Sequence, residues 1–229
     1  MDFSKRAESL ELLDQPGIPA TDIERNMFEL SIINQKLGGH AITIEGFFQL
    51  ADKSAKIQVC EIGCGGGDNL KAIEKKAKER YPGLSFTGID INGDCIRVAE
   101  NIKWEKPVIF LVSDYKKVQF ESKPDIIFCS LFCHHFKEDE LIDMFRWMSG
   151  NSVIGFFIND LHRHPLAYHS IRMLTSLFSK SYLVKNDAPL SVLRGFKKKE
   201  LTVLLDKAGI SNYTIRWKWA FRWLVIARS

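Results

Sequence analysis

A glycine-rich turn between an apolar run and a helix constrains the fold of this chain more than any other feature of the sequence. Residues 57–62 form a buried-type strand that leads into Gly63-Cys64-Gly65-Gly66-Gly67, and a helix is predicted over residues 68–80. Glycine lets the chain reverse sharply at positive φ, and it lets a ligand approach the backbone without meeting a Cβ. The turn therefore predicts a parallel sheet with a ligand site at its carboxyl edge.

Strands and helices alternate after this turn. Short, continuously apolar runs between amphipathic stretches indicate a sheet covered on both faces. Strands are predicted at 57–62, 84–91, 108–113, 125–130, 152–159, 211–218 and 221–227, and helices at 68–80, 94–102, 137–148, 164–179 and 197–208. The last two strands have the composition of an antiparallel edge pair. We predict an α/β fold: a Rossmann-like, doubly wound, seven-stranded sheet, mostly parallel with an antiparallel C-terminal strand.

The first fifty-odd residues are predicted to be helical. Thr21 and Glu24 have the spacing of a capping box, so a helix should begin there and end at Gly38-Gly39. A second helix is predicted over residues 43–52, and a short one before the turn at residues 16–19. We predict two parts, an N-terminal helical lid at 1–53 and the main domain at 54–229.

Composition excludes several classes of protein. The 229 residues carry a net charge of +4 without a long basic run, which does not favour a nucleic-acid partner. The apolar runs are too short for stable membrane insertion, and no signal peptide is visible. The five cysteines include no C-x-x-C pair, which is typical of reduced thiols in the cytoplasm. We predict a cytoplasmic protein; the sequence does not predict its oligomeric state.

One cluster resembles a metal site in sequence only. Cys129, Cys133, His134 and His135 are close together, but they fall at a predicted strand end, where alternate side chains point to opposite faces. A zinc site needs converging ligands. We therefore predict no metal.

Two carboxylates indicate which ligand the turn holds. Asp90 follows the second predicted strand, where an acid can accept hydrogen bonds from both ribose hydroxyls of a nucleoside. Glu61 lies two residues before Gly63, where it would repel a pyrophosphate but suits a ligand with an ammonium and a sulfonium group. The glycine spacing also differs from G-x-G-x-x-G. These features favour S-adenosylmethionine over NAD.

The pattern E-x-G-x-G-x-G resembles the first motif of the class I S-adenosylmethionine-dependent methyltransferases. Residues 113–115 fall where that family has an acid beside the adenine, and residues 124–130 resemble its fourth strand. Residues 131–136 are similar to the histidine-bearing loop of its small-molecule members. The resemblance implies a set of cofactor-binding residues: Glu61, Gly63, Cys64, Gly65, Gly67, Asp90, Ile91, Asp114, Tyr115 and Ser130.

A narrower resemblance lies largely outside this core. Residues 11–14, 33–39, 159–163 and 191–196 resemble methyltransferases associated with type III polyketide synthases. That resemblance implies a phenolic or quinol-like acceptor. The chain departs from many of these relatives at Ser149-Gly150-Asn151, where they carry a longer turn.

Three histidines are candidates for catalysis. His134 and His135 follow the fourth predicted strand and His162 follows the fifth, all at the carboxyl edge where ligands bind in such sheets. Histidine titrates near neutral pH and can deprotonate an acceptor hydroxyl. A structural role for each histidine remains open, as do a helix cap for Asp90 and an Asx-turn for Asp114.

We predict methyl transfer to a small hydroxylated acceptor, as O-methylation, with the N-terminal helices forming the acceptor pocket. Two alternatives stay open: C-methylation of a quinone-type acceptor, and a non-catalytic S-adenosylmethionine-binding protein. Methylation of nucleic acid is disfavoured, because residues 130–133 lack the Asn/Asp-Pro-Pro-aromatic pattern. A dehydrogenase is disfavoured by the glycine spacing.

Overall fold

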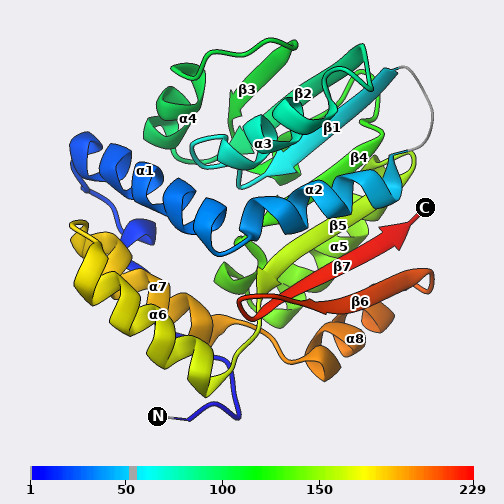
Figure 1. Cartoon of the computed structure of the whole chain (residues 1–229). Coiled ribbons are helices and arrows are strands. Elements are labelled where there is room, and N and C mark those ends of the chain that lie inside the picture. The colour runs from blue at the N-terminus through cyan, green and yellow to red at the C-terminus, as the bar shows by residue number, and fades with distance from the viewer. Residues whose placement is uncertain (1, 52–55) are drawn as a thin grey trace.

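The computed structural model describes residues 2–51 and 56–229, and its centre is a seven-stranded sheet in the order β3-β2-β1-β4-β5-β7-β6 (Figure 1). The strands are β1 Lys56–Ile62, β2 Gly83–Asp90, β3 Val108–Val112, β4 Ile126–Ser130, β5 Gly155–Leu161, β6 Tyr213–Lys218 and β7 Arg222–Arg228. β1 to β5 pair in parallel, whereas β7 lies antiparallel between β5 and β6. The predicted fold class is confirmed.

Helices cover both faces of this sheet. The described helices are α1 Ala20–Lys36, α2 Gly39–Leu50, α3 Asp68–Ala77, α4 Gly93–Glu100, α5 Glu138–Asn151, α6 Pro165–Phe178, α7 Tyr182–Arg194 and α8 Lys198–Lys207, with 3-10 turns η1 Leu12–Asp14, η2 Tyr115–Lys117 and η3 Cys133–His135. α2, α3 and α4 pack on one face, and α5 and α8 on the other. Every residue of β4 is buried, which explains why its sequence is continuously apolar.

The second N-terminal helix belongs to the core of the sheet. Phe47 and Leu50 of α2 are buried against residues of β1, α3 and β5. A Cβ at Gly46 would lie 2.6 Å from the ring of Phe157, so the helix and strand approach each other closely at that glycine. The predicted boundary between residues 53 and 54 lies outside the described residues. The lid stays a prediction, and the packing of α2 restricts it to the chain before residue 39.

Several predicted elements differ from the structure. α1 begins at Ala20 after Pro19, and no side-chain hydrogen bond caps it, so the capping box at Thr21 was wrong. α2 begins at Gly39 rather than at residue 43. Helix α7 was not predicted, because Pro189 within it is normally a signal that a helix ends.

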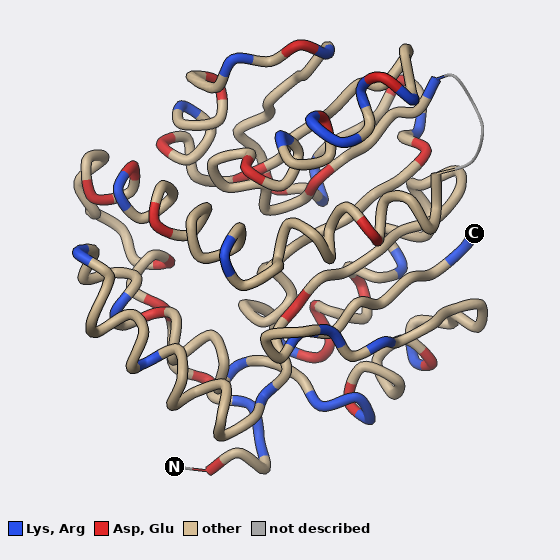
Figure 2. The backbone as a smooth tube through the Cα atoms, viewed as in Figure 1, with Lys and Arg blue, Asp and Glu red and all other residues tan. Residues whose placement is uncertain are grey.

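α1, α6 and α7 form a separate group at one end of the sheet, beside the carboxyl ends of the parallel strands (Figure 1). Figure 2 shows acidic and basic residues interspersed over the elements, without a large region of one sign. Among the helices of residues 2–51 and 56–229, none is long and apolar enough to cross a membrane.

Candidate active site

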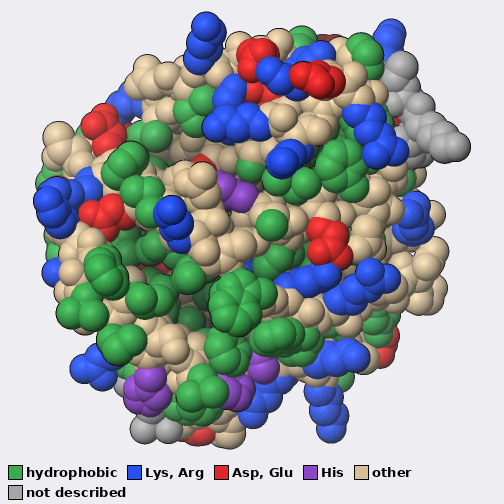
Figure 3. All heavy atoms as spheres, viewed as in Figure 1, with side chains coloured by type: hydrophobic (Ala, Val, Ile, Leu, Met, Phe, Trp, Pro, Cys, Tyr) green, Lys and Arg blue, Asp and Glu red, His purple; other side chains and the backbone are tan. Residues whose placement is uncertain are grey.

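A cavity of about 1050 Å³ lies between the carboxyl edge of the sheet and the helices α1, α6 and α7. Its floor includes the glycine turn after β1, Asp90 after β2 and Ser130 at the end of β4. Apolar side chains form much of its wall: Met27, Leu30 and Ile33 of α1, Ile171 and Leu174 of α6, and Val184 of α7. Figure 3 shows hydrophobic side chains gathered around a hollow on this face. One cavity therefore joins a polar floor to an apolar wall.

The glycine turn has the backbone conformation that its sequence predicts. Gly63, Gly65 and Gly67 have φ values of 65°, 49° and 76°, in the left-handed region that favours glycine. A Cβ at Gly63 would lie 2.1 Å from the ring of Phe132, so that residue must be glycine for the two loops to pack. Gly63 and Gly65 line the cavity, whereas Gly67 lies outside the lining and begins α3.

Asp90 connects the turn to the second strand and lines the cavity. Its Oδ2 accepts a hydrogen bond of 2.8 Å from the backbone N–H of Gly65, and its Oδ1 accepts one of 2.9 Å from Asn92. Burial raises the pKa of Asp90, while these two hydrogen bonds oppose the rise. Asn92, not Asp90, caps α4, because its side chain accepts from Asp94 and Cys95. The carboxylate of Asp90 is thus held at the cavity edge.

Three further predicted cofactor residues line the cavity: Cys64, Ile91 and Ser130. Ile91 is 77% exposed, an unusual position for an isoleucine. The hydroxyl of Ser130 is buried and has no hydrogen-bond partner among the described residues. A buried polar atom without a partner costs free energy, which a ligand in the cavity could relieve.

Glu61 lies beneath the turn and does not line the cavity. Its Oε1 accepts a hydrogen bond of 3.2 Å from Asn69, and its Oε2 has no partner among the described residues. Burial raises the pKa of Glu61 well above its ordinary value, and the nearby Asp68 adds to the rise. Direct contact between Glu61 and a cofactor stays a prediction.

Asp114 and Tyr115 also lie outside the cavity lining. The carboxylate of Asp114 accepts a hydrogen bond of 3.0 Å from the backbone N–H of Lys116, which is the Asx-turn considered as an alternative. The ring of Tyr115 is buried, in edge-on contact with Phe132 and Trp147. In this structure both residues support the loop after β3.

His134 is fully buried between two carboxylates. Its Nδ1 lies 2.8 Å from Oδ1 of Asp160, and its Nε2 lies 3.4 Å from Oε1 of Glu11. Burial by itself would lower the pKa of His134, but the carboxylates of Asp160 and Glu11 outweigh it and raise that pKa to about 9. The same contacts lower the pKa of Asp160 and of Glu11 against the effect of burial.

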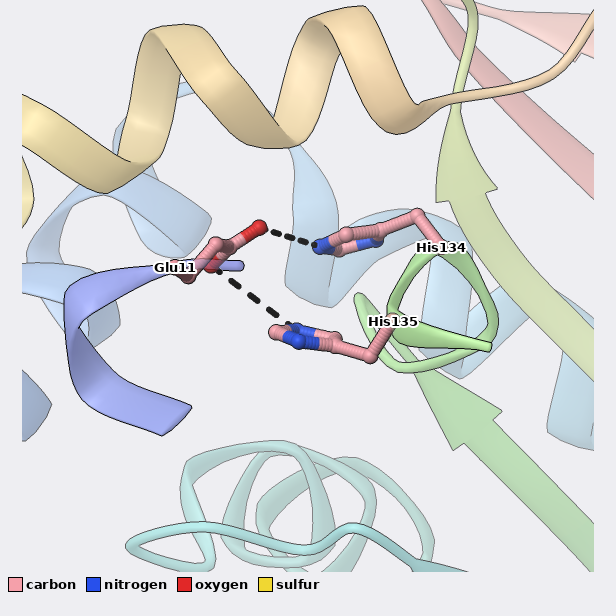
Figure 4. Close-up of side chains that lie close together, drawn as sticks. All are labelled: Glu11, His134 and His135. Carbon is pink, nitrogen blue, oxygen red and sulfur yellow. Dashed lines mark ion pairs between the residues drawn. The ribbon is translucent and has the colours of Figure 1, made fainter. Parts of the chain in front are cut away.

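His135 lies beside His134 and is partly open to the cavity. Its Nδ1 is 3.0 Å from Oδ2 of Asp14, and its Nε2 is 3.9 Å from Oε2 of Glu11. The two imidazole rings are tilted against each other with centroids 4.4 Å apart. Both rings line the cavity, and Figure 4 shows them pointing toward Glu11 from η3. The structure therefore brings two of the three predicted catalytic histidines together.

His162 lies apart from this pair. It does not line the cavity, and its Nδ1 accepts a hydrogen bond of 3.3 Å from the indole of Trp217. Burial lowers the pKa of His162. Its neighbour His164 caps α6 by accepting from the N–H of Leu166. His162 does not contact the cavity, and its catalytic role stays a prediction.

The cysteine and histidine side chains of the sequence cluster separate in the structure. Cys129 and Cys133 face each other in the core with sulfur atoms 3.4 Å apart, and neither lines the cavity. The histidines of η3 face the cavity instead. Cys129 lies in β4, whereas the other three residues belong to the 3-10 turn η3, so the turn rather than strand alternation separates Cys133 from the two histidines.

The N-terminal segment contributes residues whose role the sequence did not reveal. Glu11 is buried and accepts a hydrogen bond of 2.7 Å from Ser191 of α7. Asp187 of α7 accepts from the backbone N–H groups of residues 12 and 13. Arg194 donates to the carbonyls of His134 and His135 and so fixes η3. No spacing in the sequence connects residue 11 with residues 134 and 191; residues 11–14 stand out there only through their family resemblance.

The comparisons with known proteins agree with this geometry. Residues 59–151 match the sequence family described as "Methyltransferase domain". This stretch runs from the strand before the glycine turn to the end of α5 and includes Asp90, His134 and His135. No curated protein matches the sequence.

Several solved structures share the fold. The plantazolicin methyltransferase BpumL, solved with SAH, has 17% identity and a TM-score of 0.65, with 90% of each chain covered. Human N-acetylserotonin methyltransferase, solved with SAM, has 19% identity and a TM-score of 0.64 over 92% of this chain and 56% of its own. The magnesium protoporphyrin IX methyltransferase of Synechocystis PCC 6803, solved with SAH, has 15% identity and a TM-score of 0.55 over 86% of each.

At these identities the structural likeness establishes the fold, and the family match supplies the class of activity. Residues 59–151 match a methyltransferase domain, and the neighbours named above were solved with S-adenosylmethionine or SAH. The association with type III polyketide synthases is not tested by these matches and stays a prediction.

Proposed function

We propose that this protein, whose residues 59–151 match a methyltransferase domain, uses S-adenosylmethionine to methylate a hydroxyl group of a small, largely apolar acceptor. The observation that carries the proposal is the single cavity. It joins the glycine turn and Asp90 at one end to His134 and His135 at the other.

The polar floor fits the cofactor. The carboxylate of Asp90 can accept from ribose hydroxyls, and it already bonds the backbone N–H of Gly65 in the cavity lining. A Cβ at Gly65 would lie 3.2 Å from Sδ of Met27, so glycine keeps the turn and α1 from colliding there. The unpartnered hydroxyl of Ser130 lies in the same floor and can bond a polar group of the ligand. When bound, S-adenosylmethionine supplies a methyl group activated by its sulfonium. The protein therefore has to bind the cofactor and the acceptor, align the acceptor oxygen with the methyl group, and exclude water.

The apolar wall supports a small acceptor rather than a nucleic acid. Helices α1, α6 and α7 supply aliphatic side chains, and Trp217 and Trp219 of the β6–β7 hairpin add aromatic ones. Arg222 is the one lysine or arginine among the described lining residues, whereas nucleic-acid sites use several such residues against phosphates. Phenols and quinols have the apolar ring and the hydroxyl that this wall and the histidine pair could hold.

His134 and His135 lie where one of them can accept the proton of the acceptor hydroxyl. A hydroxyl must lose its proton as its oxygen gains the methyl group, and an imidazole can bind or accept that proton. Asp160 and Asp14 hold the Nδ1 atoms of His134 and His135, so the Nε2 atoms face Glu11 and the cavity. O-methylation uses this arrangement directly, because a hydroxyl oxygen is the nucleophile.

We restrict the proposed lid to residues 2–37. α1 and the segment before it line the cavity, while α2 is packed on the sheet. Closure of α1 over the acceptor would exclude water from the methyl group during transfer.

Thermal unfolding with S-adenosylhomocysteine, with NAD as the control, tests the cofactor. A ligand that binds only the folded state raises the unfolding temperature by mass action. We expect a rise with S-adenosylhomocysteine and none with NAD, followed by methylated products from a panel of phenols and quinols in mass spectrometry. A folded protein that binds neither methyl-cycle ligand contradicts the cofactor; products methylated at carbon contradict O-methylation.

A further inference from the structure

Three side chains with metal-binding atoms converge at the acceptor end of the cavity. The carboxylate of Glu11 and the imidazoles of His134 and His135 have ligand atoms that all lie within 4.8 Å of one another (Figure 4). Nε2 of His134 is 3.4 Å from Oε1 of Glu11, and Nε2 of His135 is 3.9 Å from Oε2. Two histidines and one carboxylate are a donor set that zinc and iron sites use.

Each of these three side chains is held from behind by a second group. Asp160 lies 2.8 Å from Nδ1 of His134, and Asp14 lies 3.0 Å from Nδ1 of His135. Ser191 donates to Oε1 of Glu11 at 2.7 Å. Metal-binding histidines almost always donate their other ring N–H to a carboxylate or carbonyl, which turns the free nitrogen toward the ion. The carboxylates at the Nδ1 atoms of both histidines therefore point to a ligand at their Nε2 atoms.

We propose that Glu11, His134 and His135 bind one divalent transition-metal ion, of the class of Zn²⁺, which holds the hydroxyl oxygen of the acceptor. The inference rests on the proposed function, because it assigns the ion to the acceptor of that reaction. It also replaces the prediction of no metal that the sequence supported.

The distances are close to those of a coordinated ion. Ligands about 2.1 Å from a tetrahedral ion lie roughly 3.4 Å from one another. Nε2 of His134 already lies at this distance from Oε1 of Glu11, and Nε2 of His135 lies 3.9 Å from the other oxygen, Oε2; one ligand atom from each residue lies within 4.8 Å of the others. A rotation of the partly exposed His135 ring would shorten the 3.9 Å distance.

The charges around the cluster favour a cation. Three carboxylates, those of Glu11, Asp14 and Asp160, contact two imidazoles. Nδ1 of each histidine faces one carboxylate, and Nε2 of each faces Glu11, so negative charge surrounds both rings. A cation at the Nε2 atoms would be stabilised by this negative field.

The side of the cluster toward the cavity is open for the acceptor. Both histidines line the cavity, so three protein ligands leave at least one position free, as in catalytic zinc sites. With both Nε2 atoms on the ion, neither histidine would take the proton of the acceptor. The acceptor oxygen would bind at the free position and lose its proton to solvent, because a Lewis acid lowers the pKa of a bound hydroxyl. The oxygen then forms its bond to the methyl carbon as the sulfur–carbon bond breaks, and the released proton balances the lost sulfonium charge.

Metal content tests this proposal. The full-length protein, treated with a chelator and dialysed, should take up about one equivalent of Zn²⁺, and Co²⁺ should give the visible absorption of a tetrahedral site. Adding Zn²⁺ should raise the unfolding temperature of the folded protein by mass action. All five cysteines are buried, so thiols on the surface do not offer a competing site.

Matched variants locate the ion. Glu11→Gln keeps the acceptor of the Ser191 hydrogen bond but removes the charge, and it should abolish the Co²⁺ absorption, as should His135→Asn. Asp14→Asn should weaken Zn²⁺ about 10- to 100-fold, which is the usual effect of an outer partner. Glu8→Gln and His169→Asn change the same residue types at exposed positions and should bind Zn²⁺ like the parent.

The outcomes separate this proposal from the proposed function. Binding of S-adenosylhomocysteine by the chelated protein, with loss of methyl transfer that Zn²⁺ restores, supports both. Full methyl transfer after chelation, or less than a tenth of an equivalent of bound metal in folded protein, overturns the metal site and leaves the methyltransferase intact. Equal loss of Zn²⁺ in Glu8→Gln and Glu11→Gln also overturns it. Absence of S-adenosylhomocysteine binding would instead contradict the proposed function.

Discussion

The two ends of the cavity are built in different ways. The floor at the cofactor end comes mainly from one continuous stretch, β1, the glycine turn, α3 and β2, in which Asp90 bonds the backbone of Gly65. The acceptor end joins Glu11, η3 and α7, three segments that are far apart in sequence. Local sequence therefore specifies the first end, whereas the second exists only when distant segments pack together. Substitutions at the two ends should affect different steps.

The largest effect is expected at the acceptor end. His135→Asn should reduce turnover about 10²- to 10⁴-fold, the usual contribution of proton transfer or hydroxyl activation. The affinity for S-adenosylhomocysteine should change less than about twofold, since His135 contacts Asp14 and Glu11 rather than the glycine turn. Steady-state kinetics and calorimetric titration measure the two quantities, and His169→Asn is the control. Parallel losses of binding and turnover would show that the two ends are not separable.

At the cofactor end, we expect a large loss of affinity for S-adenosylhomocysteine. Asp90→Ala should weaken S-adenosylhomocysteine about 100-fold, because each hydrogen bond to a charged group contributes roughly 1.5–3 kcal/mol. Asp94→Ala is the matched control, as Asp94 pairs with Arg97 and does not line the cavity. Titration calorimetry gives both affinities. An unchanged affinity in Asp90→Ala would remove the ribose role from this residue.

At the cofactor end, Glu61 should affect the free energy of unfolding rather than the affinity for the cofactor. Burial raises its pKa, so above about pH 4.5 the unfolded chain releases the proton before the folded one does, and folding becomes less favourable as the pH rises toward the folded pKa. Glu61→Gln does not titrate, so its stability relative to the parent should increase as the pH rises above about 4.5 toward the folded-state pKa of Glu61. The gain should be roughly 1.4 kcal/mol for each pH unit through which the parent takes up this proton on folding.

Urea unfolding at several pH values measures this gain. Glu79→Gln, at an exposed position after α3, should show no such trend. A stability difference that stays constant across this pH range would mean that Glu61 is ionised in the folded protein.

The smallest effect is expected for Asp114. The family resemblance gives it a place beside the adenine, but the structure shows it bonded to the N–H of Lys116 outside the cavity lining. Asp114→Asn keeps an acceptor for that turn and should change S-adenosylhomocysteine affinity less than about threefold, below roughly 0.7 kcal/mol. A loss as large as that of Asp90→Ala would mean that the loop after β3 moves onto the ligand.

The sheet and the cofactor end of the cavity could be predicted from the amino-acid sequence. Apolar strands of a length typical of a buried parallel sheet, with glycines at positive φ, are local features, and the structure has them where they were predicted. Two local signals were misleading. Pro189 lies inside α7 although proline usually ends a helix, and α1 begins at Ala20, before the capping box expected at Thr21 and Glu24.

The acceptor end could not be predicted in this way, because it depends on the packed fold. The sequence suggested three histidines without distinguishing them, while packing turned His134 and His135 toward Glu11 and left His162 against Trp217. The partners that hold the histidines, Asp14 and Asp160, lie in separate segments. The physical reason is that contacts between distant residues depend on how helices and strands pack, and no period or motif along one chain records which side chains will meet.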